Sequence, residues 1–343
     1  MKKFAFLLLG AAFAANSCMG DFSPEELALS TVKLTVNIAN PYTKAQVVEG
    51  DDMTLKNYQI LVFSDDGRLD NSTTLLTGSE RQYTLEITPG SKKIWVLGNI
   101  ASAFADISES ALRNTMTSLG DNNFDQFVMS GYKEDSVTSD KSLSLSLEHV
   151  ASKIVIERID RDFTNKEYSG LNLKIKRIYM SNVAGNASFD CSADPTVWYN
   201  KLGVSEPNQP RAVSALISED IAEYDLAEGA SYSGTHTFYV YPNPETTNRR
   251  TGVWAPRPTR LVIECEYNGN PCYYPITIPK TEGDKVDRLE RNTVYRISRL
   301  TLTRPGDKDP ETASGEVSSQ VSASFNITVA NWSGGSSYTE TFK

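Results

Sequence analysis

The sequence predicts an all-β protein with little helix, because short runs of alternating apolar and polar residues recur along its length. Clusters of Gly, Pro, Asn and Asp separate these runs, as expected for strands joined by turns. Aromatic residues make up 10% of the chain, and Tyr is the most frequent of them. We therefore expect sheets packed face to face as β-sandwiches, since the helical segments are too few for an α/β fold.

The N-terminus, residues 1–17, is predicted to be a signal peptide. Two lysines precede an apolar run over residues 4–15, which is too short to cross a bilayer as a helix. Cys18 follows small residues, so lipoprotein processing would leave it as the first residue, carrying lipid such as palmitate. The alternative is an ordinary signal peptide with an incidental cysteine, because Ala15-Asn16-Ser17 departs from the usual Leu-Ala-Gly.

Length and charge limit the organisation of the mature chain. Removing 17 of 343 residues leaves 326, which favours two domains over a single core. We place the first domain at residues 18–149 and the second at 150–343. Loss of two signal-peptide lysines changes the net charge from −9 to −11. Nucleic acid is therefore not expected as a partner.

The clearest strand of the first domain covers about residues 31–38. Val32, Leu34, Val36 and Ile38 share one face there, and polar residues occupy the other. Further strands are predicted at 57–63, 83–87, 94–100 and 143–147, and a helix from the N-cap Ser108 to about Leu119. Strands of the second domain are predicted at 153–159, 171–178, 237–241, 260–267, 273–278, 293–302, 321–329 and 338–342.

Two cysteines flank a predicted hairpin. A two-residue turn at Asn268-Gly269 would place Cys265 directly opposite Cys272. An oxidising compartment would permit a disulfide there, and packing as two small apolar side chains is the equal alternative. Cys191 is then left unpaired and is expected to be buried.

No catalytic machinery is expected. The chain has only two histidines, His149 and His236, and it lacks a Gly-x-Ser-x-Gly elbow, an HExxH motif and a phosphate-binding glycine loop. Cysteine spacing typical of zinc sites is also absent. We therefore predict no enzyme activity, no cofactor and no metal site.

Several segments, taken in order, resemble the fimbrillins, subunits of Bacteroidales type V pili. These are the lipoprotein signal, the alternating first strand followed by a basic residue and Ala, Val150-Ala151-Ser152-Lys153, Arg291-Asn292-Thr293-Val294-Tyr295, and Thr328-Val329-Ala330-Asn331-Trp332. No single motif is highly specific, and residues 182–234 match nothing in the family pattern. The resemblance covers both ends and the domain junction.

The resemblance implies two transthyretin-like β-sandwich domains, lipid anchoring in the outer membrane and later incorporation into an extracellular fimbrium. It also implies that a trypsin-like protease removes the first strand, and that a strand from another subunit takes its place. Lys44, followed by Ala45, occupies the position of the basic residue in the family pattern, where Arg is usual, so the identity of the protease stays open. The alternative is that Lys44 is a solvated loop lysine. The partners would be other copies of the chain or related pilus subunits, with host or bacterial surface ligands for adhesion.

The residues add conditions to this exchange hypothesis. Loss of the first strand would expose slots for its four aliphatic side chains, and burial of each contributes about 1.5 to 3 kcal/mol. We expect the first strand to lie at a sheet edge, where another strand can add. A first strand at the centre of a sheet, hydrogen-bonded on both sides, would rule out polymerisation by exchange and leave a tethered surface domain. The donor candidate is the tail, residues 331–343, with Trp332, Tyr338 and Phe342 as its apolar side chains. A packed edge strand of its own domain is the alternative for this segment.

A second hypothesis is a surface lipoprotein that does not polymerise and binds glycan or host protein as a tip or anchor adhesin. Exposed aromatic residues such as Trp198, Tyr199 and Trp254 would supply its binding surface.

Overall fold

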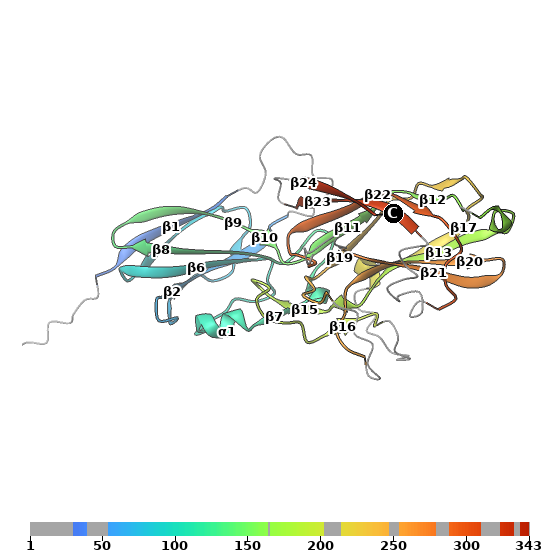
Figure 1. Ribbon diagram of the computed structural model, residues 1–343. Helices are drawn as coiled ribbons and strands as arrows, with labels where there is room; N and C mark the ends of the chain where they lie inside the picture. The colour runs from blue at the N-terminus through green and yellow to red at the C-terminus, as the bar shows by residue number, and fades with distance from the viewer. Residues whose placement is uncertain are drawn as a thin grey trace, which may run out of the picture.

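The structure, a computed structural model, describes residues 30–39, 54–163, 165–201, 214–246, 254–278, 288–309, 323–332 and 337–342. Nearly all regular structure in these ranges is β, which confirms the predicted fold class. The strands form two sandwiches that lie end to end (Figure 1). The division into domains at residue 149 stays a prediction.

The first sandwich has two facing sheets. The smaller has the order β5-β1-β9, formed by Gln82–Ile87, Val32–Ala39 and Lys141–Ser146. The larger has the order β10-β8-β6-β2-β3, with β4 beside β2; its strands are Glu148–His149, Met129–Val137, Gly90–Gly98, Asn57–Ser64, Leu69–Ser72 and Leu76–Thr77.

The larger sheet is covered on both faces, which explains why β2 and β6 are apolar without alternation. Ile60 and Val62 point into the core between the two sheets. Leu61 and Phe63 point the other way, into a core that also contains Leu112 of α1, Glu109–Arg113. That second core continues without interruption into the other sandwich.

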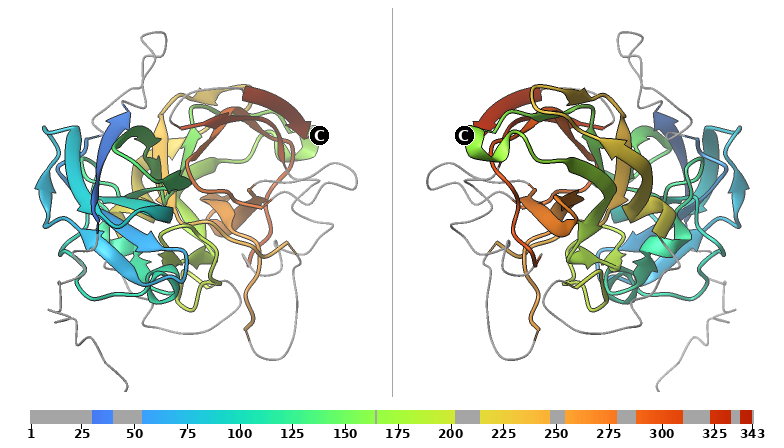
Figure 2. Two further views of the ribbon diagram at one scale, coloured as in Figure 1. Left: turned by 90° about the vertical axis from the view of Figure 1, so that its left-hand side faces the viewer. Right: turned by 90° about the vertical axis from the view of Figure 1, so that its right-hand side faces the viewer.

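The second sandwich also has two main sheets. One has the order β18-β12-β22-β11-β19, with β23 paired to β22 and β24 to β23; the strands are Ser231–Tyr232, Ile159–Arg161, Thr293–Leu302, Ser152–Ile156, His236–Val240, Ala323–Asn331 and Ser337–Phe342. The other has the order β17-β13-β20-β21, formed by Ser218–Asp225, Leu173–Ser181, Arg260–Tyr267 and Asn270–Thr277. End-on views show β24, dark red, at the rim of its sheet (Figure 2).

Short elements connect the two sandwiches. β7, Met116–Ser118, pairs with β15, Asn186–Ser188, and β14, Val183–Ala184, pairs with β16, Trp198–Tyr199. The remaining helices are α2, Ser214–Ile217, and the 3-10 helices η1, Leu119–Asp121, and η2, Lys166–Tyr168. None of the helices in the described ranges has the length and hydrophobicity needed to cross a membrane.

The predicted helix is correct at its start and too long at its end. Ser108 is the N-cap, and its side chain accepts a hydrogen bond from the Ala111 backbone nitrogen. The helix ends at Arg113, because residues 116–118 pair with β15 instead of continuing the helical spacing. Long-range strand pairing therefore overrides the local periodicity.

Candidate functional site

The candidate site is the position of the first strand, β1. It pairs antiparallel with β5, placing Leu34 opposite Leu85, and parallel with β9, placing Val36 beside Leu143. β1 is thus the central strand of its sheet, and the predicted edge position is wrong. Alternation along a strand shows that one face is buried, but it carries no information about neighbours on either side.

The inward row of β1 fills the core of the first sandwich. Leu34 and Val36 are fully buried and Ile38 is 4% exposed. Val32 is partly buried against the same cluster, which includes Ile60 of the facing sheet. At about 1.5 to 3 kcal/mol each, the three fully packed side chains contribute about 5 to 9 kcal/mol. That sum is comparable to the whole net stability of an ordinary domain, so an empty slot would strongly destabilise the sandwich.

The outward row of β1 is polar and connects to both neighbours. The Thr35 hydroxyl hydrogen-bonds to that of Thr84 on β5 at 2.9 Å. The Asn37 amide nitrogen donates to the Ser142 hydroxyl on β9 at 2.8 Å. The backbone nitrogen of Lys33 donates to a carboxylate oxygen of Asp140 at 2.8 Å. A strand that fits this position therefore needs aliphatic side chains inward and small polar ones outward.

The C-terminal strand, β24, pairs with β23 and lies at the edge of its sheet. Its backbone register places Tyr338 opposite Val329 and Phe342 opposite Phe325. The linker over residues 333–336 lies outside the described residues. Because β24 pairs with β23 alone, its departure would leave the pairing of the strands beyond β23 unchanged.

Trp332 does not belong to that tail. Its side chain is 2% exposed and packs within the core shared by the two sandwiches. Its backbone nitrogen donates to the carbonyl of Asn292 at 2.7 Å. Asn331, the other residue proposed to open the tail, is the last residue of β23. Any detachable tail therefore begins after Trp332.

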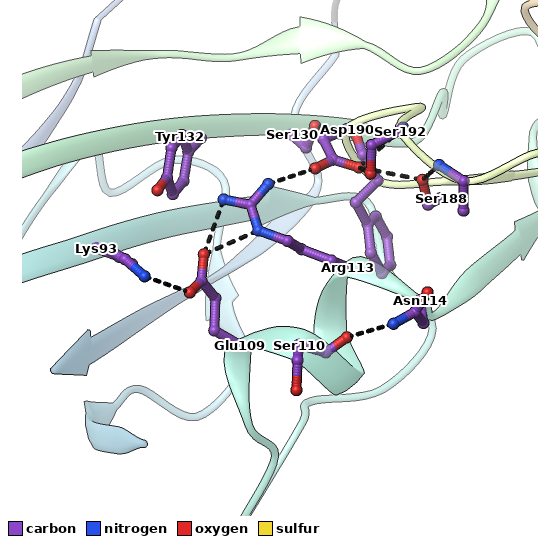
Figure 3. Close-up of polar contacts among 12 residues, drawn as sticks. Lys93, Glu109, Ser110, Arg113, Asn114, Ser130, Tyr132, Ser188, Asp190 and Ser192 are labelled. Atoms are coloured by element: carbon purple, nitrogen blue, oxygen red, sulfur yellow. Dashed lines mark hydrogen bonds and ion pairs between the residues drawn. The ribbon is translucent and has the colours of Figure 1, made fainter. Parts of the chain in front are cut away.

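A charged network at the junction holds the two sandwiches together (Figure 3). Arg113 of α1 lies between Glu109, 2.8 Å away in the same helix, and Asp190, 2.7 Å away in the loop after β15. Lys93 of β6 binds the second oxygen of Glu109 at 2.9 Å. The Arg113 guanidinium also lies 4.8 Å from the ring centroid of Tyr132.

The two carboxyl groups of this network favour ionisation. Burial alone would raise the pKa of Glu109, but hydrogen bonds from Lys93 and Arg113 outweigh it and lower that pKa. Burial likewise opposes the ionised form of Asp190, whose pKa is lowered by hydrogen bonds from Ser192 and Ser188 and by Arg113. The network is therefore charged at neutral pH.

Arg291, from the sequence motif before β22, forms a second connection. Its guanidinium donates to the carbonyl oxygens of Phe189, Glu148 and His149 at 2.8, 2.9 and 3.2 Å. It also donates to the Ser130 hydroxyl at 2.9 Å. A cleft of about 340 Å³ lies beside these groups. The motif that resembles the fimbrillin pattern thus has a structural role at the junction.

Both histidines lie in buried polar contacts. His149 Nδ1 is 3.2 Å from the Asn292 side-chain oxygen. His236 Nδ1 is 2.7 Å from a carboxylate oxygen of Glu219, and its Nε2 is 2.8 Å from the Tyr232 hydroxyl. Across the described ranges, no group of three or more His, Cys, Asp or Glu side chains could hold a metal ion.

The predicted hairpin of β20 and β21 forms as expected. Asn268 and Gly269 both have positive φ, 50° and 78°, as a type I′ turn requires. Cys265 lies directly opposite Cys272, and both are buried, free thiols in the structure. Burial raises the pKa of Cys191 to about 11, so this half-buried thiol is poorly reactive at neutral pH.

The aromatic residues proposed as a glycan-binding surface are packed. Trp198 and Tyr199 are only 8% and 7% exposed. Trp254 is half-buried, and its ring centroid is 5.6 Å from that of Trp198. Packing, the alternative to a binding surface for such aromatic residues, holds for Trp198 and Tyr199, because β16 pairs with β14 and turns these two rings into the core. Trp254 is partly buried against the same core.

Three predicted processing positions lie outside the described residues. These are Cys18, the predicted lipid attachment point, and the predicted cleavage pair Lys44 and Ala45. They stay predictions.

The fold is similar to solved structures of bacterial surface proteins. A proposed cell adhesion protein of Bacteroides eggerthii has a TM-score of 0.65 and 21% identity, covering 88% of this chain and 96% of that one. A fimbrillin of Porphyromonas gingivalis has a TM-score of 0.59 and 16% identity, and the match covers 82% of this chain and 93% of that one. A proposed cell adhesion protein of Parabacteroides distasonis has a TM-score of 0.57 and 15% identity, and the match covers 92% of this chain and 97% of that one. No protein-family profile and no curated protein sequence matches the chain. The chain therefore has the fimbrillin fold.

Proposed function

We propose that this chain is a structural subunit of a cell-surface pilus that supports adhesion, with no catalytic role. The observation that carries the proposal is the position of β1, which fills a two-sided slot with three buried aliphatic side chains. Similarity to a fimbrillin fold supports the same function. In this proposal the chain has two domains and is exported as an outer-membrane lipoprotein before it enters the fimbrium.

The central position of β1 contradicts exchange at a sheet edge, so exchange is proposed here only as a step that follows cutting of the chain. A strand paired over six residues on each side cannot be peeled from an edge, so the intact chain stays closed. However, β1 is the first element of the described residues, so one cut after residue 39 would separate it from all the other described strands. We propose that cutting between Lys44 and Ala45 releases the strand, and that the strand of another subunit then forms hydrogen bonds with both β5 and β9.

A strand-replacement experiment tests the slot. A site for a specific protease is placed between residues 40 and 53, the purified protein is cut, and a fluorescent peptide of residues 30–39 is added. We expect the labelled peptide to co-elute with the folded protein on size exclusion, because it restores the buried aliphatic row. A peptide carrying Val36→Asp is the matched control and should not enter, since it would bury a charge without a partner.

Failure of the unmodified peptide to enter a cut, folded protein would contradict exchange. That result would favour the second hypothesis, a surface lipoprotein that keeps its first strand and does not polymerise. Its ligand surface would then have to differ from the packed aromatic residues Trp198 and Tyr199.

Processing is tested separately. Limited trypsin digestion of the whole protein should give a product whose N-terminal sequence begins at Ala45, and Lys44→Gln should abolish that product alone. Cys18→Ser should remove palmitate labelling and recovery in the outer-membrane fraction. An Ala45 product from Lys44→Gln would contradict cleavage at this bond. Palmitate labelling of Cys18→Ser would contradict lipid attachment at Cys18.

A further inference from the structure

We propose that the β1 slot does not accept this chain's own C-terminal strand and instead takes the strand of a different subunit. This inference rests on the proposed function and names its partner. It follows from comparing two sets of residues: the inward row of β1, which the structure defines, and the alternation of the sequence after Gly335.

The slot sets a narrow requirement. Its three buried positions hold Leu34, Val36 and Ile38, and none of these side chains is more than 4% exposed. The hydrophobic cluster around these positions includes Ile60 and Val96 of the facing sheet. The buried Lys92 of that sheet is already paired with Asp70 at 2.8 Å. A charged side chain at any of the three positions would lose its hydration without gaining an ion pair.

The tail does not meet this requirement in the register that would use its aromatic residues. Residues at alternate positions of a strand share a face, so Tyr338, Glu340 and Phe342 would point the same way in a strand laid into the slot. If Tyr338 and Phe342 occupied the outer two positions, Glu340 would occupy the middle one. The carboxylate would then replace Val36, and the aromatic rings would exceed the volume of the aliphatic side chains they replace.

No other register of the tail fills the slot. A shift of two residues in either direction moves Glu340 into one of the outer positions, still inward. A shift of four that keeps Tyr338 in the slot places Gly334 and Ser336 at the other two positions, neither of which has an apolar side chain. A shift of one residue turns Thr339 and Thr341 inward. Reversing the strand direction gives the same three cases.

The partner is therefore a strand with aliphatic side chains at three alternate positions and small polar residues between them. The polar residues would meet Thr84 on one side and Ser142 on the other, as Thr35 and Asn37 do. The partner could be another copy of this chain or a related pilus subunit. The side chains that the slot requires favour a related subunit.

A competition experiment tests this choice. The cut protein is loaded with the labelled peptide of residues 30–39, and unlabelled peptides are compared as competitors. The peptide of residues 336–343 should compete at least about 100-fold more weakly than unlabelled 30–39, because it buries a carboxylate. Its Glu340→Val version should gain at least about 10-fold, whereas Thr339→Val, which adds the same side chain to the other face, should gain little.

The outcomes separate the two proposals. If labelled 30–39 does not enter, the slot itself fails, and this inference fails with it. If 30–39 enters and 336–343 competes within 100-fold, the slot stands and the partner choice is overturned. The same holds if the cut protein alone assembles into chains on size exclusion with light scattering, where we expect monomer.

Discussion

His149 stacks on Trp332 with ring centroids 4.0 Å apart and ring planes only 14° from parallel. The contact joins β10, the last strand of the first sandwich, to the residue that follows β23 in the second. Phe127 packs against the same indole, with ring centroids 5.5 Å apart. The end of β23 is therefore fixed by the junction, and this separates the anchored part of the C-terminus from the edge strand β24.

Trp332→Ala should destabilise the whole chain. The substitution removes a fully packed indole from the shared core, which typically costs about 3 to 5 kcal/mol of unfolding free energy. Urea denaturation followed by circular dichroism measures the change. Phe124→Ala is the aromatic control, since Phe124 is 52% exposed and should lose less than about 1 kcal/mol. Equal effects of the two substitutions would contradict the role of Trp332 in the core.

Most strands were predictable from the sequence, because alternation of apolar and polar residues reports directly on burial of one face. β8 was missed, since its stretch Lys133-Glu134-Asp135 reads as a polar loop, although the strand is paired along its length with β6. The neighbours of β1 were also unpredictable, because strand order depends on contacts between distant segments: Leu85 of β5 and Lys141 of β9 both pair with Leu34. The role of Trp332 was missed for the same reason: its partners come from distant segments.

Leu34→Ala should reveal how much β1 contributes to the first sandwich. Leu34 is fully buried, so truncation should lower the unfolding free energy by about 2 to 5 kcal/mol. Its neighbour Lys33 is exposed on the opposite face, and Lys33→Ala should change the value by no more than about 0.5 kcal/mol. Urea titration of both variants gives the comparison. A large effect of Lys33→Ala and none of Leu34→Ala would reverse the assignment of the two faces.

Glu109→Gln should weaken the junction at neutral pH and matter less in acid. The substitution removes charge-assisted hydrogen bonds with Lys93 and Arg113 and should cost about 1 to 3 kcal/mol at pH 7. Because the folded pKa of Glu109 lies below its ordinary value of 4.5, the folded chain binds this proton less tightly than the unfolded chain. The stabilisation is full above about pH 4.5 and is lost as the pH falls through the folded pKa.

The gap in unfolding free energy between the original chain and Glu109→Gln should therefore narrow between pH 5 and pH 3. Thermal or urea unfolding across this range measures it. Asp125→Asn serves as the control, because the Asp125 ion pair with Lys56 is solvent-exposed and its loss should be undetectable. A gap that stays constant down to pH 3 would show that the Glu109 charge does not stabilise the junction.

Gly131→Ala should disturb the wall of the β1 slot without touching β1 itself. A Cβ on Gly131 of β8 would lie 2.1 Å from Leu145 Cδ2 and 2.4 Å from the backbone oxygen of Ser146, both on β9. Because a backbone atom cannot move aside as a side chain can, β9 would have to shift away from β8, at a cost of about 1 to 3 kcal/mol. Since β9 pairs with β1 along six residues, the shift should also increase hydrogen exchange of the β1 amides.

Gly170→Ala is the matched control, since a Cβ there would meet nothing within 4 Å, and the added methyl should leave both stability and exchange unchanged. If Gly131→Ala lowered the unfolding free energy but left β1 exchange at the level of the Gly170→Ala control, the two walls of the slot would be mechanically independent, and β9 would not be what holds the first strand in place.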